Sequence, residues 1–238
     1  PKPQITMMPE QVSERQPLVT AKQFTVTNDY VQLQVEFPLK VISSAVHNAG
    51  MGWYNHFLNR SISPDTNIED VKEETMQFLV ERGFSLTNTV VMLTAVAANL
   101  VAIRSFHHER FSITVAVTAG VGNAVDVTKT YERQDTPYIG TINTWVIVNG
   151  KLSDEAFYQA MITATEAKTK ALAEEDIRDV QTNTIATGTA TDSLLIAATQ
   201  HGEEMPYAGP ITDVGKLIGH GVFETTVEAI RKYKQSKN

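Results

Sequence analysis

Three titratable side chains occupy positions from which they could move a proton. Asp192 follows a run of threonine and glycine residues at the entrance of an expected strand, so it could act as a general base or orient a histidine. His47 lies in a loop of small residues from which an imidazole can reach a cleft, and His220 lies between two glycines of an expected helix. Each also has a simpler explanation, namely a turn aspartate, a solvated loop histidine and close helix packing.

Other polar residues could bind a substrate or stabilise an oxyanion. Asn123 and Asn143 close two turns of small residues, where an amide could donate to an oxyanion or simply favour the turn geometry. Glu166 lies nine residues after Phe157 in an expected helix. At about 100° per residue these two residues point to opposite sides, so periodicity alone predicts an exposed ion pair between Glu166 and Lys170.

The composition excludes several classes of site. The chain of 238 residues has no cysteine, which rules out disulfides, thiolate zinc sites, iron–sulfur clusters and a cysteine nucleophile. It has 20 Lys and Arg residues against 27 Asp and Glu residues, a net charge of -7 and no basic block, which argues against a nucleic-acid partner. No ligand spacing indicates a metal site, and the sequence signatures of nucleophile-elbow hydrolases, phosphate-binding loops and zinc proteases are absent.

The distribution of apolar residues and prolines bears on location and domain organisation. The longest mostly apolar stretch, from Val90 to Ile103, is shorter than the roughly 20 residues of a spanning helix, so we expect no membrane insertion. The N-terminus lacks the pattern of a signal peptide, which favours a cytoplasmic location. The first 21 residues carry four of the nine prolines and no sustained period. They predict an arm or linker over 1–21, followed by one domain over 22–238.

Hydrophobic periodicity predicts strands and helices that are grouped without regular alternation. Alternating apolar residues around the turn signal Asn28-Asp29 indicate a hairpin, and residues 43–52 read as a loop. Further strands are expected at 90–95, 111–117, 140–150 and 192–196, and helices at 67–82, 153–172 and 212–230. Together they predict an α+β fold, in which a layered sheet of mixed or antiparallel strands is packed by three or more helices.

Six short motifs of small and polar residues lie at the ends of these elements, and together they resemble a known family. They cover residues 43–50, 118–124, 140–143, 164–168, 186–192 and 207–215. In this order and spacing they are similar to the adenosylcobinamide amidohydrolase family, from about Val41 to the last helix. The chain departs from the family pattern at 47–50, where more glycine is usual, and at Ala190, where glycine is usual.

The resemblance implies hydrolysis of the amide bond between the aminopropanol arm and the corrin ring of adenosylcobinamide. The product would be adenosylcobyric acid, in the salvage of vitamin B12 precursors. The substrate itself carries the cobalt, so no further cofactor is implied. Since the family also occurs fused to ATPases of cobalamin transporters, an association with such an ATPase is expected, and a homo-oligomer is a further expectation.

The same resemblance assigns roles to residues around one pocket large enough for a corrin. The catalytic residues it implies are Asp192, Glu166, His47 and His220. The substrate-binding residues are Ser43, Ser44, Asn48, Asn123, Asn143, Lys168, Thr189 and Thr191. Because there is no cysteine, the attacking oxygen must belong to an activated water or to a serine or threonine hydroxyl. The identity of the general base stays open.

Two other functions are compatible with the sequence. A non-catalytic corrinoid binder, acting as a regulatory domain of cobalamin uptake, would need the same cleft without an activated water. An amidase or tautomerase could act on an unrelated small substrate, with Pro1 as a base, although Pro1 precedes an arm that we expect to hang free. Apolar platforms for a corrin could come from Trp53, Tyr54, Trp145 and Tyr207, whereas core packing explains such aromatic residues equally well.

Overall fold

A mixed sheet of eight strands runs through the centre of the molecule. In the computed structural model, which describes residues 18–63, 71–131, 133 and 140–237, the strand order is β4-β3-β2-β11-β8-β6-β5, and β1 pairs with β2. The strands are β1 (Phe24–Val26), β2 (Tyr30–Ser43), β3 (Gly50–Ser61), β4 (Thr89–Thr94), β5 (Ala102–His107), β6 (Ser112–Ala119), β8 (Ile142–Asn149) and β11 (Ser193–Ala198). The pairs β3·β4 and β8·β11 are parallel, and the other pairs are antiparallel.

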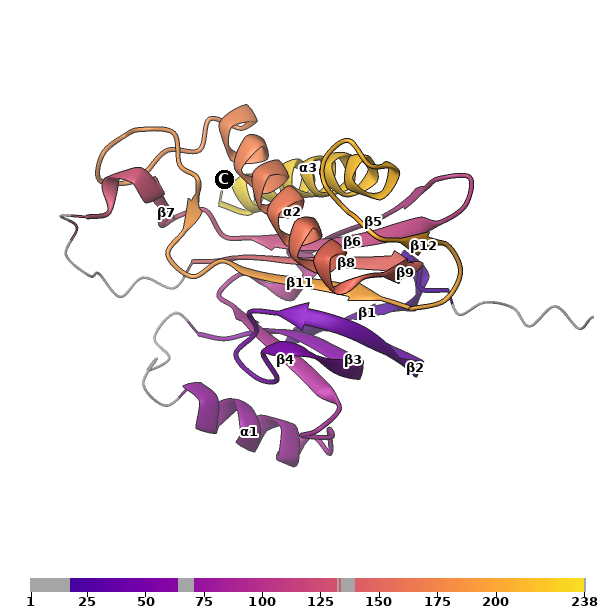
Figure 1. Ribbon diagram of the computed structural model, residues 1–238. Helices are drawn as coiled ribbons and strands as arrows, with labels where there is room; N and C mark the ends of the chain where they lie inside the picture. Colours follow the sequence, from indigo (N-terminus) through magenta and orange to yellow (C-terminus); the bar gives the residue numbers. More distant parts are fainter. Residues whose placement is uncertain (1–17, 64–70, 132, 134–139, 238) are drawn as a thin grey trace, which may run out of the picture.

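Helices cover the two outer sides of this sheet. The helices are α1 (Val71–Glu81), α2 (Asp154–Glu174) and α3 (Asp213–Lys237). Figure 1 shows α2 and α3 together over the part formed by β5, β6, β8 and β11, and α1 on the far side, beneath β3 and β4. The Ser153 hydroxyl accepts a hydrogen bond from Ala156 N at 3.1 Å and caps α2, as the sequence predicts.

The sheet folds over so that its two halves face each other. Trp145 of β8 is 2% exposed, its Nε1 lies 3.2 Å from Met92 Sδ of β4, and its ring packs edge-on against Phe57 of β3. An apolar core therefore lies between the two halves, and a second core lies between β5, β6, β8, β11 and the helices α2 and α3. The result is a four-layered arrangement of helices, sheet, sheet and helix (Figure 1).

Short elements join the loops to this frame. The strands β7 (Ala124–Val125) and β10 (Gly188–Thr189) form one antiparallel pair, and β9 (Lys151–Leu152) and β12 (Glu204–Met205) form a parallel pair. Helices of the 3-10 type are η1 (Ala21–Gln23), η3 (Ala98–Leu100) and η4 (Val127–Lys129). No helix within the described ranges combines the length and the apolar character that crossing a membrane requires.

The predicted α+β class is confirmed, and so are the hairpin of β1 and β2 and the strand over 90–95. The prediction of a loop over 43–52 is wrong at its end, because Gly50 already begins the long strand β3. Strand β5 was not predicted, because Arg104 and Ser105 break the alternation of apolar residues. Val19 is fully buried although it falls in the expected arm, and its N–H and C=O pair with the Asn149 side chain.

Three earlier expectations fall outside the described residues. These are Pro1, most of the N-terminal arm, and the predicted helix start at Asn67. The described part of the first helix begins at Val71, and Gly83 follows its end with a φ of +72°, as a helix-terminating glycine does.

Candidate active site

A pocket of about 280 Å³ lies between α2 and the neighbouring strands β8, β11 and β2. Its apolar lining comes from Ile142, Met161, Ala164 and Leu194, and its polar lining from Ser44, Thr144, Thr165, Lys168, Asp192 and Ser193. These residues come from four separate segments of the chain. The pocket thus brings a cation, a carboxylate and several hydroxyls to one apolar hollow, which is the usual composition of a small-molecule site.

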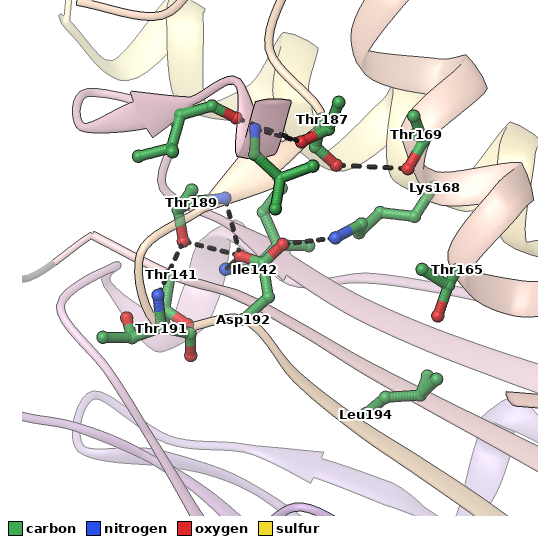
Figure 2. A network of polar contacts seen from close by, with 12 residues as sticks. Thr141, Ile142, Thr165, Lys168, Thr169, Thr187, Thr189, Thr191, Asp192 and Leu194 are labelled. Carbon is green, nitrogen blue, oxygen red and sulfur yellow. Dashed lines mark hydrogen bonds and ion pairs between the residues drawn. The ribbon is translucent and has the colours of Figure 1, made fainter. Parts of the chain in front are cut away.

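The Lys168 ammonium and the Asp192 carboxylate form an ion pair at this pocket. Lys168 Nζ contacts Asp192 Oδ2, and the two side chains are only 14% and 19% exposed. The other oxygen, Oδ1, accepts hydrogen bonds from Ile142 N at 3.1 Å, Thr189 N at 3.1 Å and the Thr189 hydroxyl at 2.5 Å. Figure 2 shows Lys168 reaching from α2 towards this carboxylate. Donors therefore surround Asp192 and fix the direction of Lys168.

The run of threonine and glycine before Asp192 explains how the chain makes this arrangement. Ser193 pairs in register with Asn143, so the parallel strands β8 and β11 bring Asp192 beside Ile142 N. The Thr169 hydroxyl donates to Thr187 O at 3.1 Å and ties the loop to α2. A Cβ at Gly188 would overlap both the Asp192 carboxylate and the Lys168 ammonium. A larger residue at position 188 would therefore displace the ion pair from this position.

Two serine hydroxyls form a second polar group at the pocket. Ser44 Oγ lies 3.1 Å from Ser193 Oγ and accepts a hydrogen bond from Leu194 N at 3.0 Å. Ser193 Oγ donates to Ser44 O at 3.1 Å, so the Ser44 hydroxyl donates to Ser193 Oγ. Ser44 is exposed, which leaves one lone pair of its oxygen open to a ligand.

The hydroxyl of Thr144 is a further feature of the pocket, and the sequence analysis missed it. Thr144 lies on β8 opposite Leu194, is 2% exposed, and its Oγ1 is buried with no hydrogen-bond partner among the described residues. Burying a hydroxyl without a partner costs free energy, so such groups often await a ligand or a water. Strand alternation could have revealed it, because Thr144 and Asn143 must point to opposite faces.

Three of the predicted catalytic residues lie outside this pocket. Glu166 is exposed on the outer side of α2, as helical periodicity predicts, but the predicted ion pair with Lys170 does not form, although the structure describes both residues. His47 Nε2 lies 2.8 Å from Leu86 O, on the hairpin between β2 and β3. His220 is exposed on α3, where its ring packs edge-on against Phe106 with the centroids 5.5 Å apart. Of the predicted catalytic residues, Asp192 lines the pocket.

The predicted substrate-binding residues divide in the same way. Ser44 and Lys168 line the pocket, and Thr189 braces Asp192. Asn143 points to the other face of the sheet, where its Nδ2 donates to Asn59 Oδ1 at 2.7 Å. The remaining four residues form hydrogen bonds with backbone groups outside the pocket. Ser43 accepts from Ala45 N, and Asn48 donates to Leu86 O and Thr89 O. Asn123 and Thr191 both donate to Gly140 O. The expected convergence of Ser44, Asn123, Asn143, Glu166 and Asp192 on one pocket therefore holds for Ser44 and Asp192.

A second carboxylate network braces the loop that carries Asp192. Asp179 accepts hydrogen bonds from Asp126 N, Gln181 N and Thr182 N at 2.7–3.1 Å and pairs with Arg133 at 3.1 Å. Burial acts to raise the pKa of Asp179, but these donors and the Arg133 charge outweigh it and hold the pKa below the usual 3.8. Within the described ranges, no group of three or more His, Asp or Glu side chains gathers as metal ligands do.

Comparison with known proteins identifies the family. Residues 15–238 match the family model of CbiZ, adenosylcobinamide amidohydrolase. The chain belongs to the adenosylcobinamide amidohydrolase family. It is therefore a hydrolase that cleaves an amide, and the resemblance found in the six sequence motifs is confirmed.

Several relatives have similar sequences. An adenosylcobinamide amidohydrolase of Methanosarcina mazei is 31% identical over 72% of this chain and 78% of its own length. An uncharacterized protein of Methanocaldococcus jannaschii is 29% identical over 71% of this chain and 73% of its own length. An uncharacterized ABC transporter ATP-binding protein of Bacillus subtilis is 26% identical over 84% of this chain, a match that spans only 37% of that longer protein.

Solved structures resemble the fold only distantly. A protein of Pyrococcus horikoshii aligns with a TM-score of 0.47 at 11% identity, over 91% of this chain and 79% of its own. An L-aminopeptidase D-Ala-esterase/amidase of Ochrobactrum anthropi aligns with a TM-score of 0.45 at 11% identity, over 88% of this chain and 82% of its own. These scores are too low to assign a role to any residue.

Proposed function

We propose that this chain hydrolyses the amide bond between the aminopropanol arm and the corrin ring of adenosylcobinamide at the pocket of Lys168 and Asp192. In this reaction the oxygen of water becomes bonded to the carbonyl carbon, and the C–N bond breaks. The products are aminopropanol and adenosylcobyric acid, which returns an incomplete corrinoid to the synthesis of vitamin B12. The observation that carries this proposal is the Lys168–Asp192 ion pair beside the hydroxyls of Ser44 and Thr144 in an apolar pocket.

The size of the pocket favours entry of the arm rather than of the whole substrate. Pockets that enclose a drug-sized ligand have about 300–1,000 Å³, and this pocket has about 280 Å³. A corrin is much larger than a drug-sized ligand. The arm and the scissile amide therefore enter, and the ring stays outside.

Lys168 is suited to stabilise the negative charge that develops on the carbonyl oxygen. An ammonium has three N–H donors, and one of them is directed at Asp192. The other two can face a substrate oxygen, in a pocket where apolar walls strengthen such a hydrogen bond. Since Asp192 already accepts hydrogen bonds from Ile142 and Thr189, it acts by positioning Lys168 rather than as a free base.

Two routes deliver the attacking oxygen. In the first, a water held by the Ser44 hydroxyl attacks the carbonyl carbon, and its proton passes to the departing amine nitrogen. In the second, the Ser44 oxygen attacks, the amine leaves with the serine proton, and water then hydrolyses the ester. Only the second route forms a covalent acyl-enzyme, which mass spectrometry of the quenched protein would detect. A Ser44→Ala variant with reduced but measurable turnover and no acyl-enzyme supports the first route, because that route forms no bond between Ser44 and the substrate.

Incubation of the purified chain with adenosylcobinamide tests the proposal. We expect stoichiometric release of aminopropanol and the appearance of adenosylcobyric acid. A shift in the corrinoid spectrum with the ligand unchanged would instead support the non-catalytic binder. Turnover of small amides without any corrinoid binding would support an amidase for an unrelated substrate. The predicted ATPase association and homo-oligomer stay predictions.

A further inference from the structure

One face of α2 carries exposed apolar side chains next to the pocket. Tyr158, Met161, Ile162 and Thr165 follow one another at steps of three, one and three residues, which places them on one helical face. Met161 and Thr165 line the pocket, and Tyr158 lies one turn before Met161 along the same edge of α2. Ile162 lies four residues before the exposed Glu166, so it faces solvent beside this edge. Tyr158 and Ile162 are each 58% exposed.

Strand β3 carries two more exposed apolar side chains on the same side of the sheet. Met51 pairs with Ile42 and Trp53 pairs with Lys40, two and four residues before Ser44 on β2. Alternate residues share a face, so Met51 and Trp53 lie on the face of Ser44. At about 3.3 Å per residue and about 4.8 Å between strands, they lie about 8 Å and about 14 Å from Ser44. Met51 is 41% exposed and Trp53 54%.

Contacts of Lys40 establish that this face is the one beneath α2. Lys40 pairs with Asp154 at 2.5 Å, and its Nζ lies 5.6 Å from the centroid of the Phe157 ring. The helix wall of Tyr158 and Ile162 and the strand wall of Met51 and Trp53 therefore flank the same side of the pocket. We call these four residues the apolar surface.

We propose that the apolar surface binds the corrin ring of the substrate while the aminopropanol arm occupies the pocket. The inference rests on the proposed function and adds the place of the macrocycle to it. The ring is attached to the arm, so it must lie where the pocket opens. Trp53 and Tyr158 offer flat, amphipathic surfaces, which suit a conjugated macrocycle with polar amides at its rim. A separate protein partner is disfavoured, because it would block the pocket.

The test is the binding of adenosylcobyric acid, which has the ring but not the arm and cannot be turned over. Isothermal titration calorimetry gives its dissociation constant for the unaltered chain and for Trp53→Ala and Tyr158→Ala. We expect each substitution to raise the dissociation constant by about tenfold, the usual effect of truncating a central aromatic contact. Met76→Ala is the control, since Met76 is 43% exposed on α1, which covers the opposite side of the sheet (Figure 1). There we expect a change of less than about twofold.

The outcomes separate this inference from the proposed function. If the unaltered chain binds the ring and both variants bind it equally well, the inference is wrong, whatever the turnover. If binding depends on Trp53 and Tyr158 but adenosylcobinamide is not hydrolysed, the role of the apolar surface in binding the ring is supported and the proposed activity fails. If the unaltered chain does not bind adenosylcobyric acid at all, the inference is overturned.

Discussion

Asp179 and Asp192 lie in the same loop after α2, and each accepts several hydrogen bonds, but their surroundings differ. Asp179 accepts three backbone N–H groups and pairs with Arg133, and no pocket residue contacts it in the described part of the chain. Asp192 accepts donors from Ile142 and Thr189 and pairs with Lys168, which lines the pocket. Each oxygen of Asp179 accepts two hydrogen bonds, whereas Asp192 Oδ1 accepts three and Asp192 Oδ2 accepts one, from Lys168. What distinguishes Asp192 is the cation that it orients.

The largest expected effect is on turnover when this cation is removed. Lys168→Met keeps the length of the side chain but has no donor for the oxyanion, so kcat for adenosylcobinamide should fall by about 10²–10³-fold. Asp192→Asn should lower kcat by about 10²-fold, because Lys168 loses its orienting charge. Steady-state kinetics with circular dichroism as a folding control measures both. Near-normal rates in the folded Lys168→Met variant would remove the pocket from the mechanism.

The Asp→Asn substitution at Asp179 should lower stability and leave turnover nearly unchanged. Asp179→Asn replaces an accepting oxygen with an amide that cannot accept from Asp126 N and leaves the Arg133 charge unpaired. The free energy of unfolding should fall by about 2–4 kcal/mol, the cost of unpaired buried groups. At a temperature where the variant is folded, kcat should stay within about threefold of the unaltered value. Urea unfolding and kinetics together test the contrast, and a selective loss of kcat would overturn it.

The strands and helices could be predicted from the sequence better than the residues that line the pocket. Alternation and capping residues placed most strands and α2, because their apolar faces are continuous. Strand β3 was hidden, since its residues from Gly50 to Asn55 face solvent in part and show no clean period. Periodicity correctly predicted an exposed Glu166, which the family motif had suggested as catalytic. A motif contains consecutive residues, but only those on one face of a helix or strand can line the pocket.

Strand β8 illustrates that limit. Asn143 attracted attention as an amide at a turn, yet it points to the other face and binds Asn59. Its neighbour Thr144 faces the pocket. Which face of β8 looks at α2 depends on the crossover of the chain between β8 and β11, and no local pattern encodes that crossover. The ion pair of Lys168 and Asp192 likewise joins residues 24 positions apart in sequence.

A smaller effect, on KM, is expected when the buried hydroxyl of Thr144 in the pocket is removed and is compared with removal of the buried hydroxyl of Thr226 in the core. Thr144→Val removes a buried hydroxyl that has no partner in the described chain, so the free protein should be as stable or more stable. If Thr144 pairs with the substrate, the KM for adenosylcobinamide should rise by about tenfold. Thr226→Val is the matched control, because Thr226 Oγ1 is also buried without a partner among the described residues, on α3 and away from the pocket. It should leave KM unchanged, and an equal KM for both variants would refute the role of Thr144.

The smallest expected effect is on the pH dependence of stability. It compares the buried carboxylates of Asp126 and Asp179 with the buried imidazole of His56. Burial lowers the pKa of His56 below the usual 6.5, and Gln32 Nε2 lies 2.8 Å from its Nε2, an arrangement that suits the neutral ring. The unfolded chain therefore takes up a proton at a higher pH than the folded chain, so stability falls as pH drops below about 6.5. A hydrogen bond from the Thr184 hydroxyl lowers the pKa of Asp126 and, in spite of burial, backbone donors lower the pKa of Asp179. The folded protein therefore loses stability in a second window, below about pH 3.8, where the unfolded chain takes up these protons first.

These two windows can be separated by thermal melts between pH 8 and pH 3. In His56→Gln the first decrease in Tm should disappear and the second should remain, because glutamine does not titrate. In Asp179→Asn the second should shrink and the first should remain. A flat Tm between pH 7.5 and 5.5 in the unaltered chain would mean that His56 has the same proton affinity in both states. Stability would then depend on pH through the carboxylates of the loop after α2 and not through the sheet.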